Sequence, residues 1–176
     1  MKQYDYIVMG SGIAGLYCAL LAQEHGTVLI FTKGSIEDCN TRYAQGGIAA
    51  PVGPDDSPEL HMQDTLAAGD GLCDPHAVAI LTHEASDRIQ DLIRYGVPFD
   101  TLHGEIALTR EGAHSRSRVL HAGGDATGKH IELTLAGLAR MSRVTIMEYT
   151  LATEILVEEG VATGVRALDC HTGLQE

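Results

Sequence analysis

At 176 residues, the chain is long enough for one well-buried domain and too short for two ordinary ones. Its formal net charge of −12 argues against nucleic acid or an anionic membrane as the main partner, because like charges repel. The apolar runs fall far short of the roughly 20 residues that span a bilayer. A strand begins within a few residues of Met1, and no N-terminal signal is visible. We therefore expect a soluble α/β protein.

The cysteines and histidines are spaced without a metal-binding pattern. The four cysteines form no Cys-x-x-Cys pair, and none of the nine histidines forms His-x-His or His-Glu-x-x-His. We therefore expect reduced thiols, a cytoplasmic location and no metal site.

The chain opens with a strand, a glycine-rich turn and a helix. A short apolar run at residues 4–9 precedes Gly10-Ser11-Gly12-Ile13-Ala14-Gly15, and an Ala/Leu-rich helix is predicted over residues 14–25. Gly26 suits a left-handed cap at the end of that helix. The continuous apolar run at residues 28–31 predicts a second, parallel strand that is covered on both faces. These elements predict the βαβ unit of a Rossmann-like α/β fold.

The glycine turn carries the dinucleotide fingerprint Gly-x-Gly-x-x-Gly. Gly10 allows a tight turn, Gly12 lets the backbone approach a pyrophosphate, and Gly15 lets the helix pack close to the strand. The helix N-terminus adds N–H donors and a partial positive charge for the phosphates. The sequence therefore predicts a dinucleotide site here.

The end of the second strand departs from the NAD-binding pattern. An acid about 20 residues past the glycines would hold the ribose of NAD, but Thr32-Lys33 stand at this position. Residues 34–50 follow, rich in small residues and containing Gly46-Gly47. Two interpretations remain open: a surface loop, or a second backbone cradle whose N–H groups a flat ligand approaches.

The middle of the chain predicts two helices and a hairpin. Residues 51–58 predict a flexible acidic loop. Ser57-Pro58 and Asp74-Pro75 each combine a capping side chain with a proline at the first helical position. The second helix has apolar residues at helical spacing, among them Ile80 and Leu81, up to Tyr95-Gly96. Residues 100–108 predict a hairpin that turns near Gly104.

Residues 108–128 hold the densest cluster of functional groups. Three arginines, two histidines and two acids fall within this stretch of an otherwise acidic chain: Arg110, Glu111, His114, Arg116, Arg118, His121 and Asp125. A solvated loop with exchangeable charges is one interpretation. The other is a binding surface for a small anionic molecule beside the cofactor.

The last third of the chain predicts a helix, a strand and a hairpin. Thr127-Gly128 begin the helix, and residues 144–147 form a third parallel strand. Residues 154–158 and 161–169 then predict an antiparallel hairpin, the start of a small β-meander.

Three motifs together resemble the flavoprotein family of succinate dehydrogenase, fumarate reductase and L-aspartate oxidase. They are Gly-Ser-Gly-x-Ala-Gly at 10–15, Thr-Lys-Gly at 32–34 and Asn-Thr-x-Tyr-Ala-Gln-Gly-Gly-Ile-Ala-Ala at 40–50. The resemblance implies an FAD site in which Thr32-Lys33 replace the usual acid. It assigns to the cofactor Gly10, Ser11, Gly12, Ile13, Ala14, Gly15, Thr32, Lys33, Asn40, Thr41, Arg42, Tyr43, Ala44, Gln45, Gly46, Gly47 and, at the adenine end, Ala152.

Two positions favour the L-aspartate oxidase branch of that family. Quinone-linked members attach FAD covalently through a histidine, and the matching residue here is Asn40, which implies non-covalent FAD. Leu-Thr-Arg-Glu-Gly-x-His-Ser at 108–115 resembles the aspartate oxidases. Glu111 there implies a carboxylate that pairs with the ammonium group of aspartate and is the expected catalytic-site residue. His114, Arg116 and His121 either shape the pocket or brace the loop.

The resemblance implies oxidation of L-aspartate to iminoaspartate, with oxygen or fumarate as acceptor. This reaction is the first step of de novo NAD synthesis, and it implies functional coupling to quinolinate synthase. The resemblance covers about the first third of the family's length. We therefore expect residues 1–176 to be the N-terminal portion of an FAD-binding domain, without the capping and helical domains and with little activity alone. Two alternatives stay open: a fumarate reductase or succinate dehydrogenase flavoprotein, and a non-catalytic nucleotide-binding module.

Overall fold

The computed structural model of the chain describes residues 2–175. The sequence predicts one domain, and the chain divides into two compact units. The first unit contains the residues up to Tyr43 and those from Ile131 onward. The second unit contains residues 44–130.

A parallel sheet of three strands organises the first unit, in the order β1-β2-β8. The strands are β1 (Tyr6–Met9), β2 (Val28–Phe31) and β8 (Thr145–Met147). Central β2 is paired on both sides and all of its residues are buried, as its continuous apolar sequence predicts. The βαβ unit and the third parallel strand are therefore confirmed.

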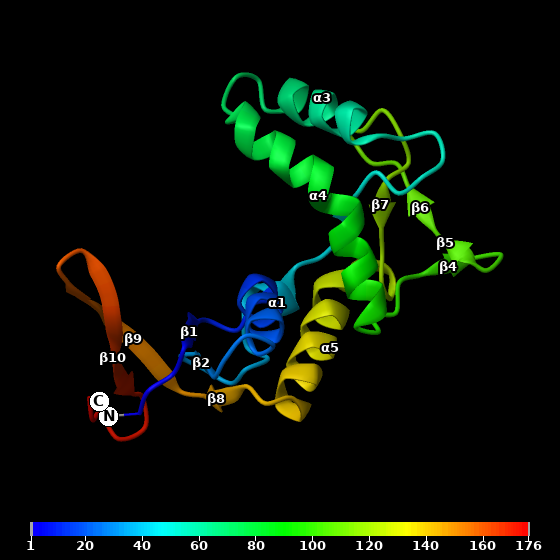
Figure 1. Cartoon of the computed structure of the whole chain (residues 1–176). Helices are drawn as coiled ribbons and strands as arrows, with labels where there is room; N and C mark the ends of the chain where they lie inside the picture. Colours follow the sequence, from blue (N-terminus) through cyan, green and yellow to red (C-terminus); the bar gives the residue numbers. More distant parts are fainter. Residues whose placement is uncertain (1, 176) are drawn as a thin grey trace. The chain divides into compact units, whose positions relative to one another are not determined.

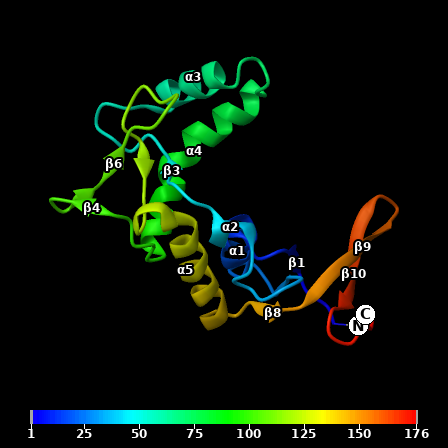
Figure 2. The ribbon, with the colours of Figure 1, turned by 180° about the vertical axis from the view of Figure 1, so that it is seen from behind.

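Helices cover this sheet and its carboxyl end. α1 (Ile13–Ala22) packs against β1 and β2 and buries Leu16, Ala19 and Leu20 (Figure 1). The short α2 (Asn40–Tyr43) lies beside α1, as Figure 2 shows from behind. α5 (Thr127–Met141), predicted from Thr127-Gly128, leads into β8.

A long antiparallel hairpin follows β8 in the first unit. It consists of β9 (Thr150–Glu158) and β10 (Val161–Asp169), drawn from orange to red in Figure 1. Glu159 and Gly160 form its turn with φ angles of 51° and 82°. The hairpin predicted around these two residues is confirmed.

Two helices with defined caps dominate the second unit, α3 (Pro58–Ala68) and α4 (Pro75–Arg94), which pack together. The Ser57 hydroxyl accepts from the Leu60 N–H at 3.2 Å. The Asp74 carboxylate accepts from the N–H groups of His76 and Ala77, at 2.8 and 3.2 Å. Both predicted helix starts are confirmed.

Short strands complete the second unit. β3 (Ile48–Ala49), β7 (Val119–Leu120) and β6 (Leu108–Thr109) form an antiparallel sheet in that order. β4 (Thr101–Leu102) and β5 (Glu105–Ile106) form the predicted hairpin. A 3₁₀ turn, η1 (Gly124–Ala126), precedes α5.

The left-handed cap predicted at Gly26 is wrong. α1 ends at Ala22, its cap Gln23 is right-handed, and Gly26 has no positive φ. A Cβ at Gly26 would lie 2.7 Å from Asp5 Oδ2. Gly26 therefore lets the Asp5 side chain approach, and Asp5 Oδ2 accepts from the Thr27 N–H and hydroxyl, both at 2.7 Å.

Burial corrects two further expectations. Ile80 and Leu81 are 49% and 60% exposed, although their spacing places them on the predicted apolar face of α4. The loop at residues 51–58, predicted to be flexible, is fixed at Asp56, whose side chain is fully buried against Arg118. All four cysteines are free thiols. Within residues 2–175, no helix has the length and apolar character needed to cross a membrane.

Candidate functional site

A cavity of about 600 Å³ lies at the carboxyl ends of β1 and β2 in the first unit. The glycine turn, the segment before α2, α2 itself and the start of β9 enclose it. Its lining residues are Met9, Gly10, Ser11, Gly12, Phe31, Thr32, Lys33, Asp38, Cys39, Asn40, Thr41, Tyr43, Thr150, Leu151 and Ala152. A crevice at the carboxyl ends of parallel strands is where open α/β sheets bind nucleotides.

The glycine turn has the geometry that the fingerprint requires. Gly10 has φ +98°, a conformation that L side chains rarely adopt. A Cβ at Gly15 would lie 2.1 Å from the Gly10 carbonyl oxygen, so only glycine permits this packing of α1 on the turn. Gly12 caps α1 without a side chain, which leaves the helix N-terminus approachable by phosphate groups.

Two hydroxyl groups connect the cavity wall to neighbouring segments. The Ser11 hydroxyl donates to Thr32 Oγ1 at 3.2 Å, and both residues are buried. The Ile13 N–H donates to Thr41 Oγ1 at 3.0 Å, which joins α2 to the first turn of α1. Thr32 and Thr41 thus hold the glycine turn from two sides.

The loop after β2 adds two lining residues that the sequence reasoning missed, Asp38 and Cys39. The Tyr43 hydroxyl donates to Asp38 Oδ1 at 3.0 Å, and this bond raises the pKa of Tyr43. Arg42 instead pairs with Glu37 at 3.0 Å. One sequence signal could have identified Asp38 as a site residue: it is an acid in the loop that follows Thr32-Lys33.

The structure gathers some of the predicted cofactor residues and not others. Nine of them line the cavity: Gly10, Ser11, Gly12, Thr32, Lys33, Asn40, Thr41, Tyr43 and Ala152. Ile13, Ala14, Gly15 and Arg42 lie in the first unit but outside that lining. Ala44, Gln45, Gly46 and Gly47 belong to the second unit.

The paired glycines of the second unit differ from each other. Gly46 has φ +74°, and no atom lies within 4 Å of the position its Cβ would take. A Cβ at Gly47 would lie 2.4 Å from Val119 Cγ1 and 2.5 Å from the Leu120 carbonyl oxygen. Gly46 therefore presents open backbone, whereas Gly47 is required for packing against β7.

Glu111 lies in the loop after β6, and its side chain is 53% exposed. His121 Nε2 is 3.4 Å from Glu111 Oε1 and 3.0 Å from the Thr109 hydroxyl. His121 Nδ1 is 3.3 Å from the Gly124 carbonyl oxygen. Because a carbonyl oxygen only accepts, this contact is a hydrogen bond when Nδ1 carries a hydrogen. In neutral His121, Nε2 accepts from Thr109, and only the protonated ring donates to Glu111.

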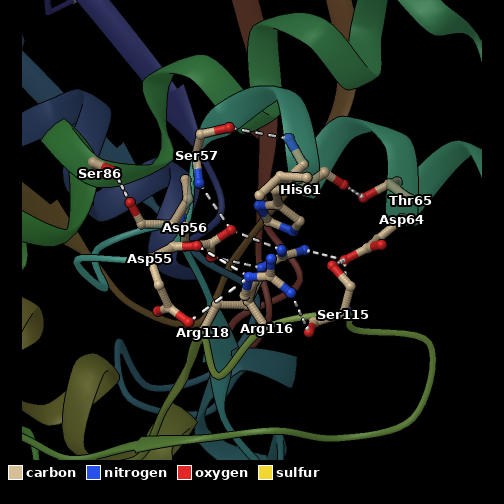
Figure 3. Close-up of polar contacts among 12 residues, drawn as sticks. Asp55, Asp56, Ser57, His61, Asp64, Thr65, Ser86, Ser115, Arg116 and Arg118 are labelled. Atoms are coloured by element: carbon tan, nitrogen blue, oxygen red, sulfur yellow. Dashed lines mark hydrogen bonds and ion pairs between the residues drawn. The ribbon is translucent and has the colours of Figure 1, made fainter.

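Arg118 anchors the other end of this loop and is fully buried (Figure 3). Its Nε and Nη2 donate to the two oxygens of Asp56, each at 2.8 Å, and its Nη1 donates to Asp64 Oδ2 at 2.7 Å. The N–H and hydroxyl of Ser115 also donate to Asp64 Oδ2, both at 2.8 Å. Arg118 thus connects the loop to α3 and to the segment before it.

Burial and hydrogen bonding oppose each other in this cluster. Burial disfavours the charged form of Asp64, but the bonds from Ser115 and Arg118 outweigh it and lower the pKa of Asp64. Burial lowers the pKa of His61, and the Arg118 charge lowers it further. The His61 and His114 rings lie 5.8 Å apart, and neither Nδ1 atom has a partner among the described residues.

Arg116 is another charged residue of this stretch, and it braces the loop between β6 and β7. Arg116 Nε donates to the Asp55 carbonyl oxygen at 3.0 Å, and its Nη1 donates to the Ser115 carbonyl oxygen at 3.2 Å. Arg116 therefore stabilises the loop conformation, whereas the Glu111 carboxylate remains exposed.

Residues 5–175 match the family model described as FAD binding domain. The chain belongs to this family. The L-aspartate oxidase of Streptomyces coelicolor is 46% identical over 164 residues, which are 92% of this chain and 28% of that protein. The L-aspartate oxidase of Synechocystis is 45% identical over 89% of this chain and 28% of that protein. The chloroplastic L-aspartate oxidase of Arabidopsis thaliana is 40% identical, covering 96% and 26%.

Solved flavoproteins share the fold. Mycobacterium smegmatis Sdh1 in complex with UQ1 matches with a TM-score of 0.90 and 30% identity, over 98% of this chain and 31% of that one. An E. coli quinol fumarate reductase FrdA variant matches with a TM-score of 0.91 and 28% identity, over 99% and 30%. The chain thus spans between a quarter and a third of the length of these relatives.

The residues present fit FAD as the cofactor of the family. The close packing at Gly15 and the approachable N-terminus of α1 suit a pyrophosphate. Thr32, rather than an acid, stands at the end of β2, where NAD-binding proteins hold the ribose. FAD is the cofactor that the family match supports, and the residues of this cavity fit it.

Proposed function

We propose that this chain is the FAD-binding part of an enzyme that oxidises L-aspartate to iminoaspartate. The observation that carries the proposal is Glu111, an exposed carboxylate on a loop fastened at its other end by buried Arg118. The relatives named L-aspartate oxidase support the same substrate, with identities of 46% and 45% in two bacterial proteins.

In this proposal the first unit holds FAD without a covalent bond. The α1 N-terminus and Gly12 receive the pyrophosphate, and Ala152 meets the adenine end through its backbone. Asn40 lines the cavity and offers a carboxamide, which is no nucleophile for flavin attachment. In the second unit, the open backbone of Gly46 suits the approach of a flat ring. When bound, FAD supplies the hydride acceptor.

Glu111 selects the amino acid in this proposal. A carboxylate near the α-carbon pairs with the ammonium group that aspartate has and succinate lacks. His121 Nε2 lies 3.4 Å from Glu111 Oε1, and its neutral form donates nothing there and so leaves the carboxylate charge available to the substrate. Arg118, Asp56 and Asp64 hold the loop so that Glu111 keeps its direction.

Substitution of Glu111 tests the proposal in the protein that carries this chain at its full length. Glu111→Gln removes the charge and should lower kcat/KM for aspartate by about 10²-fold, the loss expected when a charged partner is missing. Turnover of fumarate or succinate should change less than about threefold. Glu105→Gln, at an exposed glutamate of β5, is the matched control. An equal effect of both variants on aspartate turnover would refute the role of Glu111.

A fumarate reductase or succinate dehydrogenase flavoprotein is the second candidate function. Its support is structural, since the TM-scores against Sdh1 and FrdA are 0.90 and 0.91. A panel of aspartate, succinate and fumarate separates the two candidates. Turnover of succinate or fumarate without turnover of aspartate would favour the second. Flavin binding without turnover of any of the three would favour a non-catalytic nucleotide-binding module.

The proposed reaction also has a cellular setting. We place it as the first step of de novo NAD synthesis, with oxygen or fumarate as the acceptor and with coupling to quinolinate synthase. A cytoplasmic location is part of the proposal, supported by the free thiols of all four cysteines. Residues 1–176 by themselves are proposed to lack turnover, since they span 28% of the length of the Streptomyces relative.

A further inference from the structure

A buried carboxylic acid lies behind the cofactor cavity of the first unit. Glu132, in α5, has no exposed surface, and neither of its carboxyl oxygens has a hydrogen-bond partner among residues 2–175. Buried polar groups in folded proteins are nearly always paired. Two buried carboxyl oxygens without hydrogen-bond partners are therefore unusual.

Glu132 is surrounded by groups that favour its neutral form. Burial disfavours the carboxylate, and the negative charge of Glu37 acts in the same direction, so the pKa of Glu132 lies above its ordinary value. The Cys39 thiol and the Arg42 charge oppose this shift without reversing it. The Arg42 guanidinium is paired with Glu37 at 3.0 Å, and the opposite charge of Glu37 offsets its effect on Glu132.

Cys39 connects this acid to the cavity. It lines the cavity and interacts with Glu132, although the contact falls short of a well-formed hydrogen bond. Burial, followed by the Glu132 carboxyl, raises the pKa of the Cys39 thiol. A neutral acid beside a neutral thiol costs less to bury than a carboxylate, which in this place would be a buried, unpaired charge.

The contacts continue from Cys39 to the glycine turn. The Arg42 N–H donates to the Cys39 carbonyl oxygen at 3.1 Å, and so Cys39 stands at the entry to α2. Thr41, one residue into α2 from Asn40, accepts from the Ile13 N–H at the start of α1. A shift of Cys39 would therefore move the side chains that face the cofactor and the cap of the phosphate-binding helix.

We propose that Glu132 is a positioning residue of the cofactor site: as the neutral acid it holds Cys39 and α2 in the FAD-binding geometry, and its loss of a proton weakens FAD binding. The role is exerted through Cys39, because Glu132 itself does not line the cavity. The inference concerns the cofactor alone and stands whichever substrate is oxidised.

FAD affinity as a function of pH tests this role, measured on flavin-free protein that carries this chain at its full length. We expect the dissociation constant of the unsubstituted protein to rise about fivefold or more as the pH increases above the ordinary glutamate range, where Glu132 with its raised pKa loses its proton. Glu132→Gln has the same shape and no ionisable proton. It should keep the low-pH affinity across the whole range.

Two further variants separate positioning from folding. Glu24→Gln, at an exposed glutamate of the first unit, should keep the pH dependence of the unsubstituted protein. Glu132→Leu, which is neutral but cannot hydrogen-bond, should also remove the pH dependence if Glu132→Gln fails to fold. A pH profile that is the same with and without the carboxyl group would overturn the proposal, as would an FAD affinity of the unsubstituted protein that does not change with pH.

Discussion

Gly15 shows how one residue serves both the fold and the cofactor. It lies inside α1, where glycine is ordinarily less favourable than alanine by about 1 kcal/mol. The packing reverses this preference, because an added Cβ would lie 2.1 Å from backbone oxygen of Gly10. The helix and the turn approach each other closely enough to present the N–H groups of α1 to a phosphate.

Gly15→Ala should therefore destabilise the protein and weaken FAD binding. The clash involves backbone that cannot rotate away, and overpacking of this kind costs roughly 1–3 kcal/mol. Gly137 in α5 is the matched control, since nothing lies within 4 Å of its Cβ position. Gly137→Ala should stabilise by about 0.5–1 kcal/mol. Urea unfolding of both variants measures the two signs, and a stabilised Gly15→Ala variant would contradict this account.

At the scale of elements, Arg118 joins three segments of the second unit. It stands at the start of β7, and its partners are Asp56, before α3, and Asp64, within α3 (Figure 3). Asp64 also receives two bonds from Ser115, so the loop that carries Glu111 is held at its far end. The other end of the loop continues from β6, which pairs with β7. A long loop is thereby fixed at both ends.

Arg118→Leu should cost about 3–5 kcal/mol of the free energy of unfolding, because it leaves the buried Asp56 carboxylate and the partly exposed Asp64 carboxylate without their cation. Hydrogen exchange should speed up at Ser115, whose N–H is bonded to Asp64. Arg94→Ala is the control, since its side chain is 71% exposed and such pairs contribute about 0–1 kcal/mol. Similar losses for both variants would show that the Arg118 cluster does not fasten the loop. Combining Arg118→Leu with Asp56→Asn and Asp64→Asn should recover part of the stability.

At the scale of the whole molecule, the two units carry different parts of the proposed function. The cavity lining comes entirely from the first unit, whereas Glu111, His121 and the Arg118 cluster belong to the second. The chain spans 28% of the length of the Streptomyces relative and 31% of Sdh1. Substitutions can therefore be placed in the cavity lining and in the Glu111 loop independently of each other.

Residues 1–176 produced alone should show no turnover of L-aspartate, because a single exposed carboxylate cannot hold a dicarboxylate against water. Hydrogen peroxide release with FAD and oxygen present is the measurement. The protein that carries this chain at its full length provides the positive control. Clear peroxide release by residues 1–176 would show that the site needs no other residues.

Elements that local chemistry controls could be predicted from the amino-acid sequence. The apolar run of β2, the caps at Ser57 and Asp74, and the turn at Glu159-Gly160 depend on residues close together in the chain, and each was predicted correctly. The glycine fingerprint belongs to this class too, since its spacing alone places the turn between β1 and α1.

Features that depend on partners far away in the sequence could not be predicted before the folded structure was known. Gly26 was predicted to form a left-handed cap. A glycine is needed there because the Asp5 side chain, from 21 positions earlier in the sequence, occupies the space of a Cβ. Asp56 was predicted to lie in a flexible acidic loop, but its side chain is fully buried against Arg118. No local pattern marks Glu132 among the apolar residues of α5. Its burial beside Cys39 follows from how α5 packs. Periodicity and capping report on near neighbours, whereas the state of a charged side chain is set by the groups that folding brings against it.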